Sequence, residues 1–295
     1  MTAVEEYELY AIRYATRDAR RADHFIGGDP HDAAMPMDYY VWLARNAERS
    51  VLVDIGCSRE VAERRGRTYL CSPDDVLHDM SVDPKSLSDV VITHLHYDHV
   101  GNLSRFPAAK FHVQERELAF ATGPAMRHPF ISQAFEAEDV ADLVKLNFRS
   151  RVQFHDGDTE CFPGISLHLA GGHSHGLQFV CVRTKRGKVV LASDVAHFYE
   201  NITSARPFHI AYHVGEMLDG FEKLLAVGGR DLAAIIPGHD PLVTELYPSI
   251  SGKLQGRVFR LDVSPSKAPE AAVVRLGGST VLGCLHEDEK GCFHA

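Results

Sequence analysis

The sequence lacks the features that mark membrane, disulfide-stabilised and nucleic-acid-binding proteins. It contains no run of about 18 apolar residues, so no membrane-spanning helix is expected. Its six cysteines include no C-x-x-C pair, which favours reduced thiols over a disulfide framework. Basic residues are outnumbered, with 31 Lys and Arg against 40 Asp and Glu. Because phosphate binding requires a basic patch, we expect neither a nucleic acid nor a membrane as a partner.

Two common catalytic motifs and a targeting signal are also missing. Neither a G-x-S-x-G motif nor a glycine-rich phosphate-binding loop occurs, so a serine nucleophile and nucleotide chemistry are not indicated. The N-terminal stretch MTAVEEYELYAIRYATRDARR has no apolar core of the signal-peptide type, which leads us to expect a cytoplasmic protein. Histidine, in contrast, is abundant, with 18 in 295 residues, and its placement therefore needs an explanation.

Short β-rich runs alternate with helical patterns, which predicts an α/β fold. Strands are predicted at residues 7–15, 49–57, 90–93, 109–113 and 232–238, and hairpins at 151–172 and 177–194. Helices are predicted at residues 131–146 and 214–227, and a long loop at 22–40. The length suits one large domain or two small ones, and we place a single domain at residues 1–263. Residues 264–295 would form a C-terminal extension, in which the runs 271–276 and 280–285 could pair as a hairpin.

The stretch VVITHLHYDHVGNL concentrates potential metal ligands directly after a predicted buried strand. In an extended segment, residues two apart face the same side, so His94 and His96 point together. Asp98 and His99 follow where a helix would begin. Imidazole nitrogens and carboxylate oxygens are ligands that zinc takes at about 2.0–2.2 Å. The pattern H-x-H-x-D-H therefore predicts a metal site.

Three more residues of the same kinds stand just beyond other predicted strands. They are His173, Asp194 and His239, each next to a glycine or another small residue. Together with the H-x-H-x-D-H motif they make five histidines and two aspartates, enough for two metal ions that share one carboxylate. His24, His31 and His112 have no such placement and are interpreted as ordinary residues, and His175 as a structural residue near the site.

These motifs resemble the metallo-β-lactamase superfamily, in its order, from about residue 7 to residue 250. The matching segments are THLHYDH, GGHSHG, ASD and PGH, and VDIG (53–56) resembles the strand and turn before the first motif. The resemblance implies a four-layer αβ/βα sandwich with the site at one edge of two packed sheets. It also implies one metal held by His94, His96 and His173, a second held by Asp98, His99 and His239, and Asp194 as the bridge.

Within the superfamily, the segment SDVAHFYENI and the long N-terminal loop resemble the N-acyl homoserine lactonase and 4-pyridoxolactonase group. Diiron flavoproteins carry a glutamate where His96 stands, and the commonest zinc β-lactamases carry a cysteine where Asp194 stands. The lactonase group has a substrate-contacting tyrosine three residues after the bridging aspartate. Here that position is His197, and the nearest tyrosine is Tyr199, so both are candidates for the contact with the substrate carbonyl.

The expected activity is hydrolysis of a small-molecule lactone or related ester by two divalent ions. Zn²⁺ is the ion expected, with Mn²⁺, Fe²⁺ or Co²⁺ as alternatives, because the same ligands accept all four. A hydroxide between the ions would attack the carbonyl, and Asp98 would pass a proton to the leaving oxygen. The alternatives are hydrolysis of a cyclic amide or another ester, and metal binding without turnover. The protein would be a monomer or a homodimer.

Apolar residues in the predicted loop at 22–40 suggest where the substrate enters. Phe25, Ile26 and Met35 lie in a stretch that is otherwise rich in Gly, Pro and Asp. Unless they fold back into the core, they would line an apolar entrance suited to an acyl chain or a ring.

Overall fold

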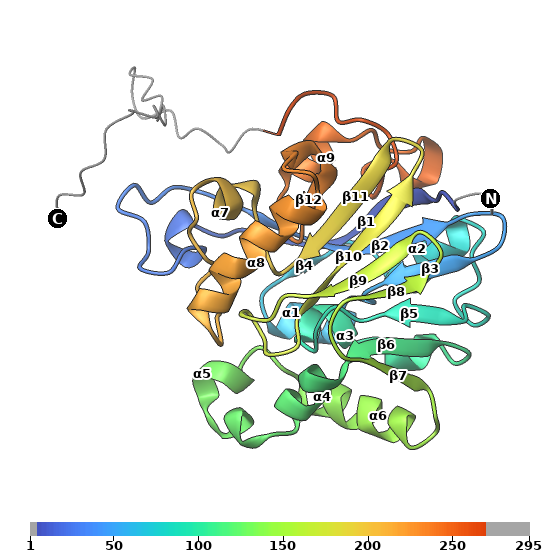
Figure 1. Cartoon of the computed structure of the whole chain (residues 1–295), viewed down its shortest axis with the longest axis horizontal. Coiled ribbons are helices and arrows are strands. Elements are labelled where there is room, and N and C mark those ends of the chain that lie inside the picture. Colours follow the sequence, from blue (N-terminus) through green and yellow to red (C-terminus); the bar gives the residue numbers. More distant parts are fainter. Residues whose placement is uncertain (1–4, 270–295) are drawn as a thin grey trace.

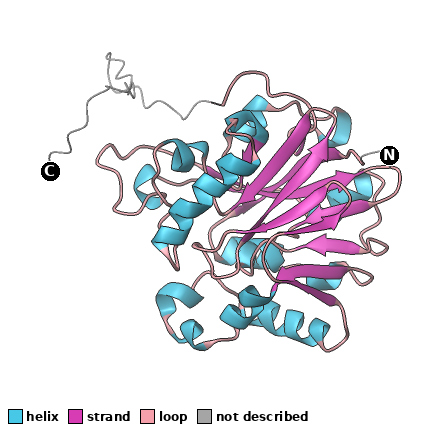
Figure 2. Cartoon of the chain, in the orientation of Figure 1, coloured by secondary structure: helices cyan, strands magenta, loops and turns pink. Residues whose placement is uncertain are grey.

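The computed structural model describes residues 5–269, which form two β-sheets packed face to face with helices on their outer sides (Figures 1 and 2). The first sheet contains β1 (Glu8–Arg17), β2 (Met37–Arg45), β3 (Ser50–Val53), β4 (Thr68–Tyr69), β5 (Asp89–Val91), β6 (Lys110–Gln114), β7 (Val152–His155) and β13 (Val258–Arg260). The second contains β8 (Thr159–Phe162), β9 (Ile165–Leu169), β10 (Gln178–Thr184), β11 (Gly187–Ser193) and β12 (Ile235–Pro237).

The helices are short and connect the strands. They are α1 (Arg59–Arg64), α2 (Pro73–Asp79), α3 (Tyr97–Val100), α4 (Glu115–Ala121), α5 (Pro129–Ser132), α6 (Ala137–Asn147), α7 (Tyr199–Thr203), α8 (Val214–Val227) and α9 (Leu242–Leu246). In the first sheet the order is β13-β1-β2-β3-β5-β6-β7, with β4 paired to β1, and β3, β5, β6 and β7 run parallel. In the second the order is β12-β11-β10-β9-β8, and only the β11–β12 pair is parallel.

Strand β2 explains why the layers form. Its alternate residues Tyr40 and Trp42 belong to the apolar cluster between the sheets, whereas Val41 and Leu43 belong to the cluster beneath the helices of the first sheet. Because side chains alternate across a strand, an uninterrupted apolar run must be covered on both faces. On the far side, Phe221 of α8 packs with residues of β10 and β11. The predicted α/β class and four-layer sandwich are confirmed.

Most predicted strands are present, but three predictions about the elements need correction. The loop predicted at 22–40 ends earlier, because β2 begins at Met37. The helix predicted at 131–146 is broken into α5 and α6. The hairpin predicted at 151–172, with its turn at 156–158, forms only in part. β7 pairs with β6 in the first sheet, and the hairpin within this range is made by β8 and β9 in the second. The turn at 156–158 therefore carries the chain from one sheet to the other.

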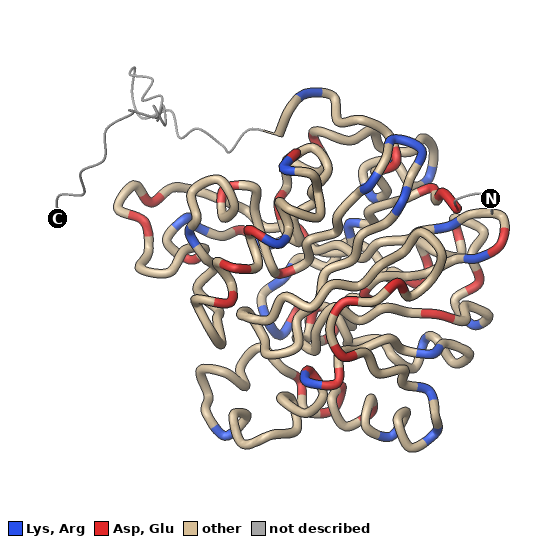
Figure 3. The backbone as a smooth tube through the Cα atoms, in the orientation of Figure 1, with Lys and Arg blue, Asp and Glu red and all other residues tan. Residues whose placement is uncertain are grey.

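The proposed C-terminal extension lies almost wholly outside the described residues, as does its predicted hairpin. None of the helices within residues 5–269 combines the length and the hydrophobicity that a membrane span requires. Acidic and basic residues are interspersed along the described chain (Figure 3).

Candidate active site

Four connecting segments from both sheets meet at one edge of the sandwich. His94 and His96 follow β5, and Asp98 and His99 lie on α3, the helix that begins directly afterwards. The other three segments follow β9, β11 and β12 and carry His173, Asp194 and His239. All seven of these side chains are buried. The structure thus brings together every residue that the sequence predicts as a metal ligand.

These seven residues form two adjacent groups that could each hold an ion. One group contains His94, His96, His173 and Asp194, and the other contains Asp98, His99 and His239; within a group, one ligand atom from each residue lies within 4.8 Å of the others. A third combination joins Asp194 and His239 to His197.

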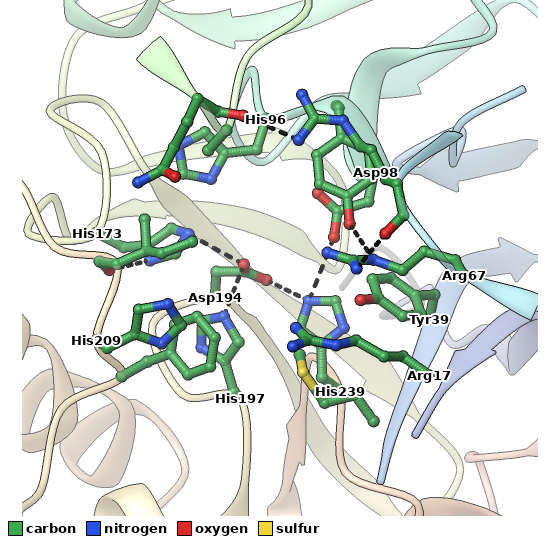
Figure 4. A pocket seen from close by; sticks show the side chains of 17 residues that line it. Arg17, Tyr39, Arg67, His96, Asp98, His173, Asp194, His197, His209 and His239 are labelled. Atoms are coloured by element: carbon green, nitrogen blue, oxygen red, sulfur yellow. Dashed lines mark hydrogen bonds and ion pairs between the residues drawn. The ribbon is translucent and has the colours of Figure 1, made fainter. Parts of the chain in front are cut away.

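Asp194 lies between the two groups, with one carboxylate oxygen toward each (Figure 4). Its Oδ2 atom is 3.1 Å from Nε2 of His173 and 3.7 Å from Nε2 of His94. Its Oδ1 atom is 3.0 Å from Nε2 of His239 and 3.3 Å from Nε2 of His99. This is the arrangement that a carboxylate bridging two cations requires.

The unpaired nitrogen atoms of the histidines fit a metal better than a hydrogen-bond network. The Nε2 atoms of His94, His99 and His173 are buried and have no hydrogen-bond partner among residues 5–269. On the opposite side of two of these rings, Nδ1 is held by a protein oxygen, the Asp54 carboxylate for His99 and the Ile210 carbonyl for His173. A donated Nδ1–H leaves a lone pair on Nε2, the form in which histidine binds metals. Buried polar atoms without partners are otherwise costly.

Burial also affects protonation at the site. It lowers the pKa of His94 and His96 well below the usual range, and the neighbouring imidazoles add to the effect. Burial acts in the same direction on His99, but the carboxylates of Asp194 and Asp54 outweigh it and raise the pKa. Since a metal ligand must be the neutral ring, His94 and His96 are already in the binding form.

Asp54 is a site residue that sequence reasoning noticed only as part of VDIG. It is fully buried, and its Oδ2 atom accepts hydrogen bonds from both the hydroxyl of Thr93 and Nδ1 of His99, each at 2.7 Å. Its Oδ1 atom accepts from the backbone N–H of Thr93 at 2.7 Å. This one carboxylate therefore fixes both the strand exit before His94 and the ring of His99.

Asp54→Asn is expected to weaken metal binding by about 10–100-fold, the usual cost of losing such an outer partner. Asparagine replaces one acceptor oxygen by an NH₂ donor. If this NH₂ group takes the place of Oδ1, it faces the backbone N–H of Thr93, which is also a donor. If it takes the place of Oδ2, it faces Nδ1 of His99, which would then have to accept, and the ring would carry its proton on Nε2, where a metal would bind. Metal content after titration with a chelator measures the effect. Asp142→Asn, on the exposed face of α6, is the control, and equal metal retention by the two variants would contradict the role of Asp54.

Glu117 links two of the segments that carry ligands. This fully buried residue of α4 accepts a hydrogen bond from the backbone N–H of Leu95 at 2.9 Å. Its other oxygen accepts from the hydroxyl of Ser174 at 2.8 Å and from the N–H of Gly176 at 2.7 Å. Residue 95 lies between two predicted ligands and residue 174 follows a third, so Glu117 sets the distance between them. No motif pointed to it in the sequence.

A cavity of about 200 Å³ opens directly over the two groups. Its lining includes five of the predicted metal ligands, namely His96, Asp98, His173, Asp194 and His239, and also His197. The remaining lining residues were not predicted from the sequence; they are Arg17, Met37, Tyr39, Arg65, Arg67, Tyr97, Gln133, Ala134, Phe208, His209 and Ile210 (Figure 4). The arginines and Tyr39 come from segments with no recognisable motif, which is why only the folded chain reveals them.

The structure separates the two candidates for the carbonyl contact. His197 lines the cavity, with its Nε2 atom 3.0 Å from Oδ2 of Asp194 and its ring stacked on Phe208 at a centroid distance of 3.6 Å. Tyr199 is fully buried away from the cavity, and its hydroxyl donates to the carbonyl of Ile235 at 3.0 Å. Its hydroxyl is therefore used within the fold.

Phe25 and Met35 follow the alternative in which the residues of the loop fold back into the core. Phe25 is buried, with the guanidinium of Arg206 4.2 Å from its ring centre. Met35 packs against the core and Ile26 is 41% exposed, and none of the three lines the cavity. The loop turns back onto the protein because Phe25 has more to gain from burial than from facing solvent.

His112 has partners that its sequence position did not suggest. Its Nε2 atom lies 3.0 Å from the Asp89 carboxylate, and Nδ1 lies 3.1 Å from His155 and 3.2 Å from the sulfur of Cys161. This hydrogen-bonded group joins the facing edges of the two sheets, on β6, β7 and β8.

An αβ/βα sandwich with clustered histidines and aspartates at one edge defines a class of proteins that bind divalent metals. The family model of the metallo-beta-lactamase superfamily matches residues 35–239, and the chain belongs to this superfamily.

Similar proteins carry lactonase names. An N-acyl homoserine lactonase from a Bacillus species is 26% identical over 221 residues, which span 69% of this chain and 82% of that relative. A solved quorum-quenching N-acyl homoserine lactone lactonase superposes with a TM-score of 0.68 at 21% identity, covering 82% of this chain and 95% of the other. AidC, described as a dizinc quorum-quenching lactonase in complex with a product, gives 0.64 at 16% identity, covering 87% and 94%. At such identities the structures establish the fold.

Proposed function

We propose that this protein is a hydrolase that opens a lactone ring with two divalent metal ions, Zn²⁺ being the ion expected. The position of Asp194 carries the proposal, because its two carboxylate oxygens lie toward two separate groups of histidines. A site for one ion would need only one of these groups. The lactonase names of the relatives support a lactone as the substrate. Residues 1–263 would form the hydrolase domain.

Each group of ligands would have a distinct role. His94, His96 and His173 would hold one ion, Asp98, His99 and His239 the second, and Asp194 would lie between them. Two ions bound in this way lower the pKa of water toward about 7 and polarise an ester carbonyl. The Asp98 carboxylate, with one oxygen 3.8 Å from Nε2 of His99 and the other 3.9 Å from Nε2 of His239, faces the same space. It would take the proton of the attacking water and deliver it to the ring oxygen as the ester bond breaks.

His197 would orient the substrate carbonyl. Stacking on Phe208 fixes its ring, and Nε2 faces Oδ2 of Asp194 at 3.0 Å. Unlike the Tyr199 hydroxyl, this nitrogen lies at the cavity, so its N–H would be shared between the carboxylate and a substrate carbonyl oxygen bound beside it. His197 also belongs to the third possible metal group, with Asp194 and His239. A variant separates the two roles, because a carbonyl donor can be lost without loss of metal.

Turnover of a lactone panel tests the function. Protein loaded with Zn²⁺ or Mn²⁺ would be assayed with homoserine lactones of varied acyl length and with pyridoxolactone. The cyclic amide counterpart of each lactone would be assayed alongside it. We expect hydrolysis of at least one lactone, lost on chelation and restored by adding metal. Turnover of amides alone would favour the cyclic amide alternative, and two bound ions without any turnover would favour a metal-binding protein.

His197→Ala is expected to lower kcat by about 10²–10³-fold, the usual cost of losing one donor to a developing oxyanion, with little change in KM or in metal content. Tyr199→Phe is the matched control, since its hydroxyl bonds Ile235 in the fold, and we expect nearly unchanged kinetics with lower thermal stability. A decrease in kcat of less than about tenfold in His197→Ala would mean that the carbonyl needs no such donor. Loss of one metal equivalent would instead make His197 a ligand.

A further inference from the structure

The cavity over the metal groups is positively charged on one side. Arg17, at the end of β1, and Arg65 and Arg67, between α1 and β4, all line it. Figure 4 shows Arg17 and Arg67 on the side where Asp98, Tyr39 and His239 lie, across the cavity from His173 and His209. The only carboxylates among the described lining residues are Asp98 and Asp194, which face the histidines. This local excess of arginine contrasts with a chain whose formal net charge is −9.

The hydrogen-bond donors of Arg65 are already used by its surroundings. Its Nε atom donates to the carboxylate of Glu136 at 2.8 Å, and its other nitrogen atoms donate to the carbonyls of Gln133 and Phe135. Its Nε atom and one NH₂ group both contact Oε1 of Glu136, while Oε2 of the same carboxylate is 2.7 Å from Arg64. With the two carbonyl acceptors as well, the guanidinium of Arg65 has little capacity left for a ligand. Arg65 therefore supports the wall of the cavity.

Arg67 is not neutralised. Its Nε atom donates to the hydroxyl of Tyr97 at 2.9 Å and one NH₂ group donates to the carbonyl of Arg65, and it forms no ion pair with a carboxylate of residues 5–269. The rings of Tyr97 and Tyr39 lie nearby, with centres 5.7 and 5.8 Å from its guanidinium carbon. The aromatic rings hold the side chain in place and leave its second NH₂ group available.

Within the described part of the chain, Arg17 has only a weak ionic partner. Its guanidinium lies 3.7 Å from the carboxylate of Asp23, whose side chain is 46% exposed, while that of Arg17 is 26% exposed. Exposed ion pairs of this kind contribute little, so Arg17 can turn to a better acceptor in the cavity at small cost.

The size of the cavity argues against a long apolar substituent. Its volume of about 200 Å³ is below the roughly 300–1,000 Å³ of typical pockets for drug-sized ligands. Phe25, Ile26 and Met35, which would have received an acyl chain, do not reach it. Besides the metal groups, the lining is mixed, since it includes the arginines, aromatic rings and the apolar side chains of Met37, Ala134 and Ile210. Its polar share other than the metal groups is provided mainly by Arg17 and Arg67.

We propose that Arg17 and Arg67 form a subsite for a carboxylate on the substrate, so that the preferred substrate is a small lactone that carries an acidic group. This inference rests on the proposed lactonase function. The planar fork of a guanidinium matches a carboxylate, and a charge-assisted pair is about twice as strong as a neutral hydrogen bond. Two divalent ions opposite two carboxylates would leave the cavity positive, which favours an anion further.

Binding of two probes that cannot be hydrolysed tests the subsite apart from catalysis. Tetrahydrofuran-2-carboxylate and tetrahydrofuran-2-carboxamide would be titrated into metal-loaded protein by calorimetry. We expect the carboxylate to bind at least about tenfold more tightly, with the preference decreasing at high salt. In Arg67→Met and Arg17→Met the carboxylate should lose about tenfold in affinity and the carboxamide little, and Arg67→Lys should retain part of the preference. Arg59→Met, on the exposed face of α1, should bind as wild type does.

The corresponding lactones test the link to catalysis. The carboxylate-bearing γ-lactone should show a higher kcat/KM than its carboxamide, through KM, and the two methionine variants should remove the difference. Two results would overturn the subsite. One is equal binding of both probes, and the other is a carboxylate preference that survives both substitutions, because the metals alone would then bind the anion. Hydrolysis of neutral lactones with no carboxylate preference would leave the lactonase function standing without it. Arginine-dependent binding of the probe without turnover of either lactone would instead contradict the lactonase function alone.

Discussion

Replacing Asp194 with alanine is expected to abolish hydrolysis and to reduce the bound metal below two equivalents. Removal of the carboxylate would deprive both groups of one anionic ligand, because its two oxygens face different histidines, at 3.1 Å from Nε2 of His173 and 3.0 Å from Nε2 of His239. It would also leave up to five imidazoles facing one another without the negative charge that offsets them. We expect kcat/KM to decrease by more than about 100-fold, beyond the range for loss of an outer partner of a ligand.

Elemental analysis of dialysed protein, together with lactone turnover, would measure this effect. Asp142→Ala on the exposed face of α6 is the control for a lost aspartate, and Asp194→Asn keeps the shape while removing the charge. If Asp194→Ala still held two equivalents of metal, Asp194 would not bridge the ions. If it kept metal and also turned over lactones, the site would have to lie elsewhere.

The candidate metal ligands could be predicted because two local rules coincide. Side chains two apart in an extended segment face the same side, which brought His94 and His96 together. Segments that leave neighbouring strands meet at one edge of a sandwich, which brought in His173, Asp194 and His239. Both rules depend only on the residue type and its distance from the end of a strand, so the sequence was enough. The four layers followed from the family resemblance, whereas periodicity indicated only an α/β fold.

Contacts between distant segments could not be predicted. Whether β7 pairs with β8 or with β6 is decided by the packing of two sheets, and the turn at 156–158 looks the same in either case. Phe25 could face an entrance or the core with equal local justification, and burial beneath Arg206 decided it. Arg17 and Arg67 carry no motif, and they meet only because β1 and the segment after α1 lie beside the same cavity.

Glu117→Ala is expected to have the largest effect on stability among the variants considered. The substitution removes three hydrogen bonds inside the protein and leaves the N–H groups of Leu95 and Gly176 and the hydroxyl of Ser174 without an acceptor. Each buried unsatisfied donor costs about 1–3 kcal/mol, so we expect the free energy of unfolding to decrease by about 3–5 kcal/mol. Chemical denaturation of the metal-free protein measures it without a contribution from bound ions.

The same substitution should also loosen the metal site, because Glu117 ties the segment of His94 and His96 to the segment of His173. Metal affinity should therefore decrease by at least about tenfold, as for other outer partners of ligands. Glu115→Ala, on the exposed side of the same helix, is the matched control and should change neither quantity.

Glu117→Gln retains one acceptor oxygen, so its stability and its metal affinity should lie between those of the two alanine variants. If Glu117→Ala unfolded at the same denaturant concentration as Glu115→Ala, water would be satisfying the freed donors. If only its metal affinity decreased, Glu117 would position the two segments without contributing to the stability of the fold.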